Sequence, residues 1–185
     1  YNNEIEDSKV LFNDIERTRV KDRQNFPDFK NIMNKFISFY LFQEKFRYKQ
    51  GLNEIAGSFI LISNYIKLPL HKVYNLFTCF VDKFLTNYYW ETEFYALQSS
   101  LSLITLLLRY HDPELNNALE YPLIKPEMYA TSWVLTLFSN KCKISVIYQL
   151  WDKLILFNDQ LFLHFIIVAS APSVIYVNIP DVFSE

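Results

Sequence analysis

Residues 47–56 read Arg-Tyr-Lys-Gln-Gly-Leu-Asn-Glu-Ile-Ala, and they join two stretches of helical character. Apolar residues recur at three- and four-residue steps from about Lys30 to Lys45, and we expect helix up to the boundary at Gln50. The same spacing resumes after Asn53, which we interpret as the cap of the next helix. Gly51 permits a positive φ or a close backbone approach at this bend. The sequence therefore predicts a helix–loop–helix unit with Gln50 in its loop.

Helical stripes of apolar residues also mark the rest of the chain. They predict helices over residues 73–84, 94–109, 144–155 and after Asp159, a short one opened by Asp112-Pro113, and one that starts at Pro126 and carries Trp133. Residues 1–10 are expected to form a short first helix or an ordered tail, residues 11–17 a helical turn or a loop, and residues 18–29 a loop. We interpret Glu91-Thr92-Glu93 as a solvated helix start.

No stretch alternates like a strand, and the 185 residues contain only two glycines for tight turns. No repeat or low-complexity linker divides the chain. The 17 Phe and 13 Tyr, together with Trp133 and Trp151, are expected to fill the space between helices. The sequence therefore predicts one all-α domain packed around an aromatic-rich core.

Composition excludes several classes of function. A net charge of −2 provides neither the basic surface of a nucleic-acid-binding protein nor a polybasic membrane patch. Cys79 and Cys142 each lie in an apolar helical pattern, and two such residues form no disulfide framework or metal motif. No segment is a transmembrane span, although 161–177 comes nearest, and no signal peptide is visible. These features predict a cytoplasmic protein without a metal of its own.

The glycine count also bears on nucleotide binding. Two glycines six residues apart, Gly51 and Gly57, cannot form either of the glycine-rich phosphate-binding motifs. The chain therefore lacks a backbone nest that could hold a phosphate. If it takes part in nucleotide chemistry, it must act on a partner that holds the nucleotide.

Four segments together resemble the TBC domain, the GTPase-activating domain that acts on Rab GTPases. The family patterns I-x-x-D-x-x-R and Y-x-Q correspond to Leu11…Asp14…Arg17 and to Tyr48-Lys49-Gln50, with Leu in place of Ile. The continuation to residue 57 is similar to Y-R-Q-G-M-N-D-I. Residues 132–138, Ser-Trp-Val-Leu-Thr-Leu-Phe, and residues 150–152, Leu-Trp-Asp, resemble two further segments of the family.

The resemblance implies a function and a set of site residues. Arg17 and Gln50 would be the arginine and glutamine fingers that enter the nucleotide site of a GTP-bound Rab-type GTPase and accelerate hydrolysis. Supporting roles are expected for residues around the two motifs: Asp14 to hold Arg17, Tyr48 to buttress Gln50, Gly51 and Asn53 to shape the loop, and Arg47 to contact phosphates or the partner. Mg²⁺ and GTP would be carried by the partner.

Two alternatives stay open at the level of sequence. The chain could be a catalytically silent scaffold of the same fold that binds a GTPase or an adaptor. It could also be a helical bundle at a membrane surface or a lipid carrier, although it lacks a basic amphipathic helix. If the resemblance holds, residues 1–185 form a TBC domain without the family's first segment and last helices. Such a domain would act in vesicle trafficking, in the cytoplasm or on intracellular membranes through its partner.

Overall fold

The protein is described by a computed structural model that covers residues 2–90, 94–120 and 123–178. This part of the chain contains no strand, which confirms the all-α prediction. Its helices are α1 (Asn2–Arg17), α2 (Phe29–Glu44), α3 (Leu52–Ile66), α4 (Leu70–Phe84), α5 (Thr86–Trp90), α6 (Tyr95–His111), α7 (Pro113–Glu120), α8 (Pro126–Tyr129), α9 (Thr131–Thr136), α10 (Ile144–Phe157) and α11 (Phe162–Asn178). The acidic segment at residues 91–93 lies outside the described residues.

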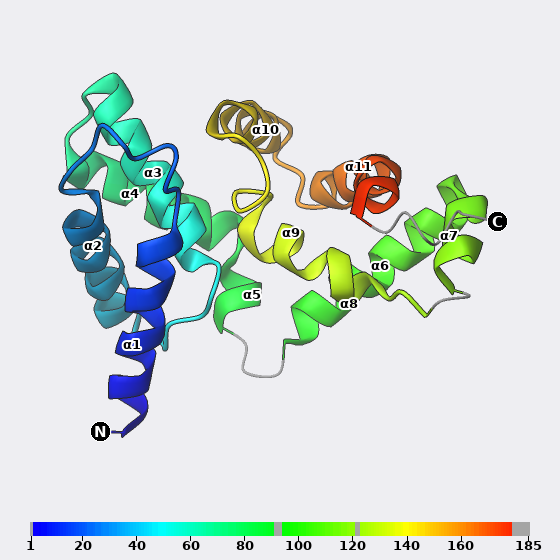
Figure 1. The fold of residues 1–185 in the computed structure, drawn as a ribbon, viewed down its shortest axis with the longest axis horizontal. Helices are drawn as coiled ribbons and strands as arrows, with labels where there is room; N and C mark the ends of the chain where they lie inside the picture. The colour runs from blue at the N-terminus through cyan, green and yellow to red at the C-terminus, as the bar shows by residue number, and fades with distance from the viewer. Residues whose placement is uncertain (1, 91–93, 121–122, 179–185) are drawn as a thin grey trace.

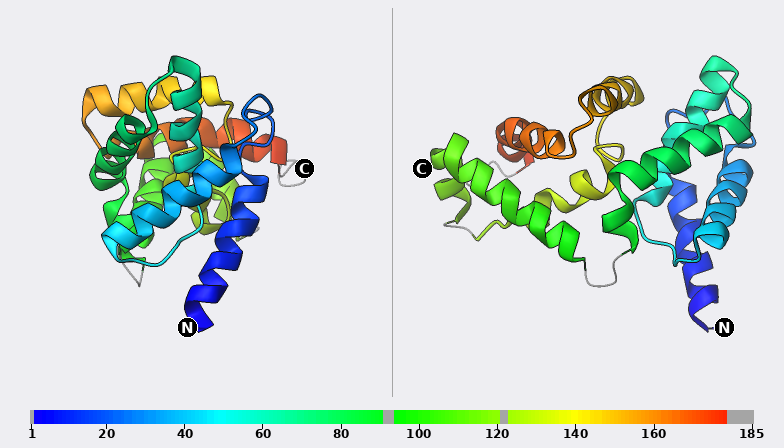
Figure 2. Two further views of the ribbon diagram at one scale, coloured as in Figure 1. Left: turned by 90° about the vertical axis from the view of Figure 1, so that its left-hand side faces the viewer. Right: turned by 180° about the vertical axis from the view of Figure 1, so that it is seen from behind.

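The helices form two groups that meet near the middle of the molecule (Figure 1). Helices α1–α5 make an N-terminal lobe, and α6–α11 make a C-terminal lobe that extends along α6. Figure 2 shows the same division from behind, with α3 and α9 at the junction. Helix α3 contacts α1, α2 and α4 within its own lobe and α9 in the other. The first two thirds of α3, from Leu52 to Leu61, are therefore buried except for Glu54.

A close helix approach fixes the end of α1 against α3. Gly57 lies in α3, and a Cβ atom at this position would be only 2.9 Å from Cγ2 of Thr18. Thr18 is fully buried and follows the last residue of α1. Because real Cβ atoms do not tolerate this distance, the residue at 57 must be glycine for α1 and α3 to meet in this way. This contact sets the position of Arg17 relative to α3.

Aromatic rings fill the space between helices, as the sequence predicts, and some of them join the two lobes. Phe59 of α3 stacks on Trp151 of α10 with ring centroids 5.5 Å apart, and Phe80 of α4 lies 4.8 Å from the same indole. Trp151 is buried and donates its Nε1 hydrogen to the carbonyl of Leu137 at 3.1 Å. Trp133 is also buried and stacks on Phe138. Both tryptophans therefore belong to the core, as expected.

Several predicted helix boundaries are wrong in the segment around Gln50, residues 45–53. Helix α2 ends at Glu44, followed by Lys45 in the left-handed conformation at φ 57°, so residues 46–49 are not helical. Asn53 lies inside α3, and the cap position is held by Gly51 at φ 106°. A bend before Gln50 therefore takes the place of the expected helix, because a left-handed residue stops the α-helical hydrogen-bond pattern.

Other boundaries differ in smaller ways. Residues 1–17 were expected as two pieces, whereas α1 is continuous from Asn2 to Arg17. The helix expected from Pro126 is broken at Ala130 into α8 and α9. Cys142 lies in the loop before α10 and not in a helix, and α5 had no signal that we recognised. No described helix has both the length and the apolar content needed to cross a membrane.

Candidate functional site

Arg17 is the last residue of α1, and its side chain is 67% exposed. One helical turn earlier, the nearly buried carboxylate of Asp14 pairs with it through Nη2 of Arg17 and Oδ1 of Asp14. An ion pair with one exposed partner adds less than about 1 kcal/mol to stability. The pair therefore contributes mainly by holding an exposed guanidinium in one direction.

Asp14 is itself held by a buried hydrogen-bond network. Tyr48 donates its hydroxyl hydrogen toward Oδ2 of Asp14 at 2.7 Å, and the hydroxyl also lies 2.9 Å from Oδ1 of Asn53. Asn53 in turn donates from Nδ2 to Thr18 at 2.8 Å, and Thr18 donates to the carbonyl of Asp14 at 2.6 Å. Burial first, and the bond to Asp14 second, raise the pKa of Tyr48 far above its ordinary value. The hydroxyl therefore stays protonated and donates to the carboxylate at neutral pH.

Gln50 reaches the same carboxylate from the other motif. It is exposed, and its Nε2 donates to Oδ1 of Asp14 at 3.4 Å, a long bond that is easily exchanged. The oxygen that pairs with Arg17 thus also accepts a hydrogen bond from the amide of Gln50. Two exposed side chains, one cationic and one a neutral donor and acceptor, converge on a single anionic oxygen.

The loop that carries Gln50 is pinned on both sides. Oδ1 of Asn53 accepts from the backbone N–H of Gly51 at 3.0 Å, which is the role that the structure gives Asn53 in place of a helix cap. Lys49 lies over the ring of Phe94 at 4.5 Å from the centroid. Arg47 forms two bonds to Asp7 of α1, at 2.7 and 2.8 Å, so its guanidinium contacts its own lobe. The Arg47 hydrogen bond is the main reason that the pKa of Asp7 lies below its ordinary value.

Two arginines beside the first motif were missed by the sequence reading. Arg23 donates to the carbonyls of Ile15 and Glu16, at 2.8 and 2.6 Å, and thereby caps the C-terminal end of α1. A cation is favoured there because the last carbonyls of a helix carry partial negative charge. Arg19 is folded inward, with its side chain only 6% exposed. Only the spacing Arg-x-Arg-x-x-x-Arg in residues 17–23 could have drawn attention to them, and spacing does not tell which arginine points outward.

This arrangement is suited to an anion brought by another molecule. An exposed guanidinium and an exposed amide can both bind a negatively charged oxygen supplied by another molecule. Tyr48 and Asn53 are buried and hold the carboxylate of Asp14 from the inside. Among the described residues, no group of His, Cys, Asp and Glu side chains could hold a metal ion.

Comparison with known families places the chain in one of them. The Rab-GTPase-TBC domain family matches residues 1–173 of the 185. The chain belongs to this family. All of the site residues described above fall within the matched range.

Individual proteins are similar to part of this TBC domain. TBC domain-containing protein kinase-like proteins of Homo sapiens and Mus musculus are each 32% identical over 113 residues, which is 61% of this chain and 12% of theirs. The Rab GTPase-activating protein tbc-11 of Caenorhabditis elegans is 29% identical over 116 residues, 60% of this chain and 12% of its own. The chain thus spans about an eighth of the length of these relatives.

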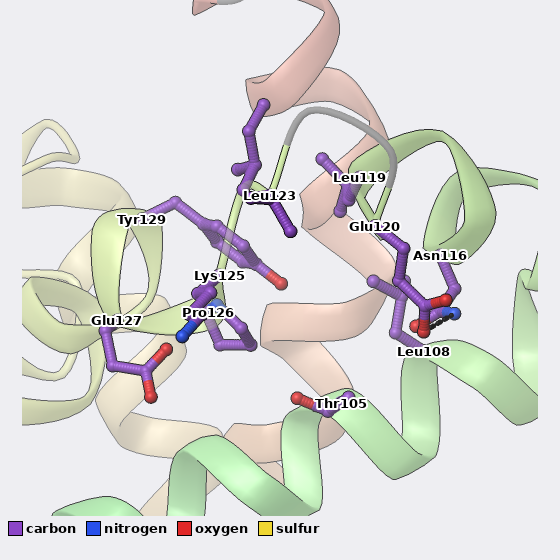
Figure 3. A pocket seen from close by; sticks show the side chains of 11 residues that line it. Thr105, Leu108, Asn116, Leu119, Glu120, Leu123, Lys125, Pro126, Glu127 and Tyr129 are labelled. Carbon is purple, nitrogen blue, oxygen red and sulfur yellow. Dashed lines mark hydrogen bonds between the residues drawn. The ribbon is translucent and has the colours of Figure 1, made fainter.

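The TBC domain also has a cavity of about 320 Å³ between α6, α7 and α8 (Figure 3). The hydroxyl of Tyr129 points into it and has no hydrogen-bond partner among the described residues. Burial raises the pKa of Tyr129 to about 12, so this group is neutral at physiological pH. Glu120 at the rim is already bonded to Asn116 and Arg109. Neither Arg17 nor Gln50 lines this cavity, so it is separate from the candidate site.

Proposed function

We propose that this TBC domain activates a Rab-type small GTPase and supplies Arg17 and Gln50 in trans to the GTP held by that partner. The observation that carries the proposal is the convergence of both side chains on Oδ1 of Asp14. Two groups that can contact one carboxylate oxygen can also contact oxygens of one γ-phosphate and its attacking water. Asp14 would hold the pair in readiness until the phosphate replaces it.

The chemistry of GTP hydrolysis fits these two residue types. Charge develops on the phosphate oxygens in the transition state, and an arginine supplied in trans is worth about 10³–10⁵ in rate, or about 4–7 kcal/mol. Arginine suits the task because its planar fork keeps its charge and meets oxygens in two places. A glutamine amide can accept a hydrogen bond from the water while it donates to the phosphate, and it does not titrate. Mg²⁺ and GTP would come with the partner.

The support residues have distinct parts in this proposal. Tyr48 and Asn53 would fix the carboxylate of Asp14, and Gly51 would let the loop turn directly after Gln50. Arg47 is assigned to the tie between the loop and α1 and not to phosphate, since its two bonds go to Asp7. Through such a partner, the domain would act in vesicle trafficking, in the cytoplasm or peripherally at intracellular membranes.

The test is a panel of GTP-loaded Rab-type GTPases, with phosphate release measured with and without the domain. We expect at least one member to be stimulated, and Arg17→Ala to reduce that stimulation by about 10²-fold or more. Arg109→Ala is the matched control, because Arg109 is also exposed and paired with one carboxylate, but lies on α6 away from the site. Binding of the GTP-bound partner without any stimulation would instead indicate a silent scaffold. Binding to liposomes without either effect would favour a lipid-binding function.

A further inference from the structure

Arg19 follows Arg17 by two residues but points in the opposite direction. Its backbone is left-handed, at φ 49°, which directs the side chain into the protein. Nη1 donates to the carbonyl of Cys142 at 3.0 Å, 123 positions later in the chain, in the loop between α9 and α10. The segment that carries Arg17 is thereby attached to the C-terminal lobe.

The contacts of Arg19 within the N-terminal lobe are ionic. Nη1 lies 3.4 Å from Oδ2 of Asp22, and Nε lies 3.5 Å from Oε2 of Glu54 in α3. Nε and Nη2 have no hydrogen-bond partner among the described residues. Burying a cation with incomplete hydrogen bonding is costly, so this arrangement is poor evidence for a purely stabilising role.

The other finger segment is seated on the same part of the C-terminal lobe. Tyr89 donates to the carbonyl of Leu135 at 2.6 Å, and a Cβ atom on Gly51 would lie 3.2 Å from both Tyr89 Oη and Cγ2 of Thr136. Gly51 is the residue after Gln50. Residues 135–142, which we call the platform, therefore contact the neighbours of both fingers.

The platform itself is tightly held. Leu137 and Phe138 are consecutive left-handed residues, at φ 46° and 64°. This backbone conformation is unfavourable for residues with a side chain, so it persists only where the surrounding packing and hydrogen bonds enforce it. Trp151 binds the carbonyl of Leu137, and Oγ1 of Thr136 lies 2.9 Å from Oδ1 of Asn140. A rigid segment with these two contacts can set the distance between the finger loops.

We propose that Arg19 is a positioning residue that fixes Arg17 relative to Gln50 by anchoring the end of α1 to the platform. The inference rests on the proposed function, because it assigns Arg19 a part in the same reaction. Arg19 does not reach the phosphate; it acts through the backbone of residues 17–19. A lysine cannot replace it, because an ammonium group cannot span the Cys142 carbonyl and the Glu54 carboxylate in one plane.

The test compares Arg19→Lys and Arg19→Ala/Glu54→Gln with the unchanged domain, on a responsive GTPase. The double variant removes the half-buried carboxylate that would otherwise be left without its cation. We expect kcat for stimulated hydrolysis to fall by about 10-fold to 10²-fold, because a shift of about 1 Å in a positioned group has this effect. KM should change by less than about threefold, since the contact of Arg17 with the phosphate is proposed to stabilise mainly the transition state.

Affinity for the partner loaded with GDP and aluminium fluoride should fall more than affinity for the GTP form. Arg109→Lys is the control and should change none of these values.

A second readout does not depend on catalysis. Amide hydrogen exchange at residues 18–23 and 141–142 should accelerate in both Arg19 variants, while exchange in α6 stays unchanged. Unchanged exchange at residues 18–23 and 141–142 in the Arg19 variants would overturn the role of Arg19. A kcat within about twofold of the unchanged domain would overturn it as well. If Arg17→Ala abolished stimulation and the Arg19 variants did not, only this inference would fail. If the unchanged domain stimulated no GTPase, the proposed function would fail, and the role of Arg19 with it.

Discussion

The side-chain amide of Gln50 donates to Oδ1 of Asp14 at 3.4 Å, although the two residues are 36 positions apart. That oxygen is also the partner of Arg17, so a buried carboxylate occupies the point where both exposed groups converge. In the proposed reaction, a phosphate oxygen takes over this point. The carboxylate would therefore organise the pair before the partner arrives.

Asp14→Asn removes the charge while it nearly preserves the shape. We expect stimulated hydrolysis to fall by about 10-fold or more, because Arg17 loses the anion that directs it. The free energy of unfolding should fall by about 1–3 kcal/mol, since the bond from the buried Tyr48 hydroxyl loses its charged acceptor. Phosphate release and urea denaturation measure the two effects.

Glu16→Gln is the control, because Glu16 also lies on α1 and pairs with a cation, Lys30, at the exposed surface. It should reduce stability by less than about 1 kcal/mol and leave hydrolysis nearly unchanged. Equal losses of activity in the two variants would argue against a special part for Asp14.

The contact between α1 and α3 predicts a rescue experiment. Replacing an exposed glycine in a helix by alanine normally stabilises the helix by about 1 kcal/mol. At position 57, however, Gly57→Ala would place Cβ 2.9 Å from Cγ2 of Thr18. We therefore expect this substitution to destabilise the domain by about 1–3 kcal/mol. Thr18→Ser removes Cγ2 and keeps the hydroxyl that binds Asp14 and Asn53.

The double variant Gly57→Ala/Thr18→Ser should recover most of that loss in urea denaturation. Each single variant serves as the reference for the other in a double-mutant cycle. Gly57→Ala stabilising the domain on its own would show that α1 and α3 are not in this contact.

His164 predicts a dependence of stability on pH. It is buried in α11, and neither ring nitrogen has a hydrogen-bond partner among the described residues. Burial is the main reason that the pKa of His164 lies below its ordinary value. The folded state therefore takes up its proton less readily than the unfolded chain, and the contribution of His164 to stability falls as pH drops below about 6.5.

His164→Leu removes that proton uptake without adding a polar group. The difference in unfolding free energy between His164→Leu and the unchanged domain should grow as pH falls from 7 to 5, at no more than about 1.4 kcal/mol per pH unit. Urea denaturation across this range measures it, and the difference cancels the carboxylates common to both proteins. A difference independent of pH would mean that the imidazole reaches solvent.

The sequence predicted the all-α fold because long apolar stripes at helical spacing occur throughout the chain. It placed helix ends less well, and α2 shows why. With only two glycines, this chain ends helices on left-handed residues such as Lys45, Lys67 and Asn158. The two lysines give no signal of a helix end, since a lysine looks the same inside a helix and at its end.

The motifs named Asp14, Arg17, Tyr48, Gln50 and Asn53 as candidate site residues, but they did not predict how these residues are arranged. No spacing along the chain indicates that Gln50 and Arg17 share one oxygen, because only the packing of α1 on α3 brings them together. Arg19 and Arg23 illustrate the same limit. Both are arginines in a charged loop, yet one is buried against the platform and the other caps α1. The extent of the domain, residues 1–185 without the family's outer segments, stays a prediction.

Stimulation of a GTPase that lacks its own water-positioning glutamine tests the central claim most directly. The partner carries Gln→Leu at that position, and phosphate release is measured in single turnover with the unchanged domain, with Gln50→Ala and with the exposed control Gln43→Ala. If Gln50 acts in trans, the unchanged domain and Gln43→Ala will still accelerate hydrolysis by the Gln→Leu partner, and Gln50→Ala will not.

Gln50→Ala should keep its affinity for the GTP-bound partner, since one neutral side chain seldom dominates an interface. Loss of all stimulation with the Gln→Leu partner, together with normal activity of Gln50→Ala on the unmodified GTPase, would contradict the dual-finger mechanism.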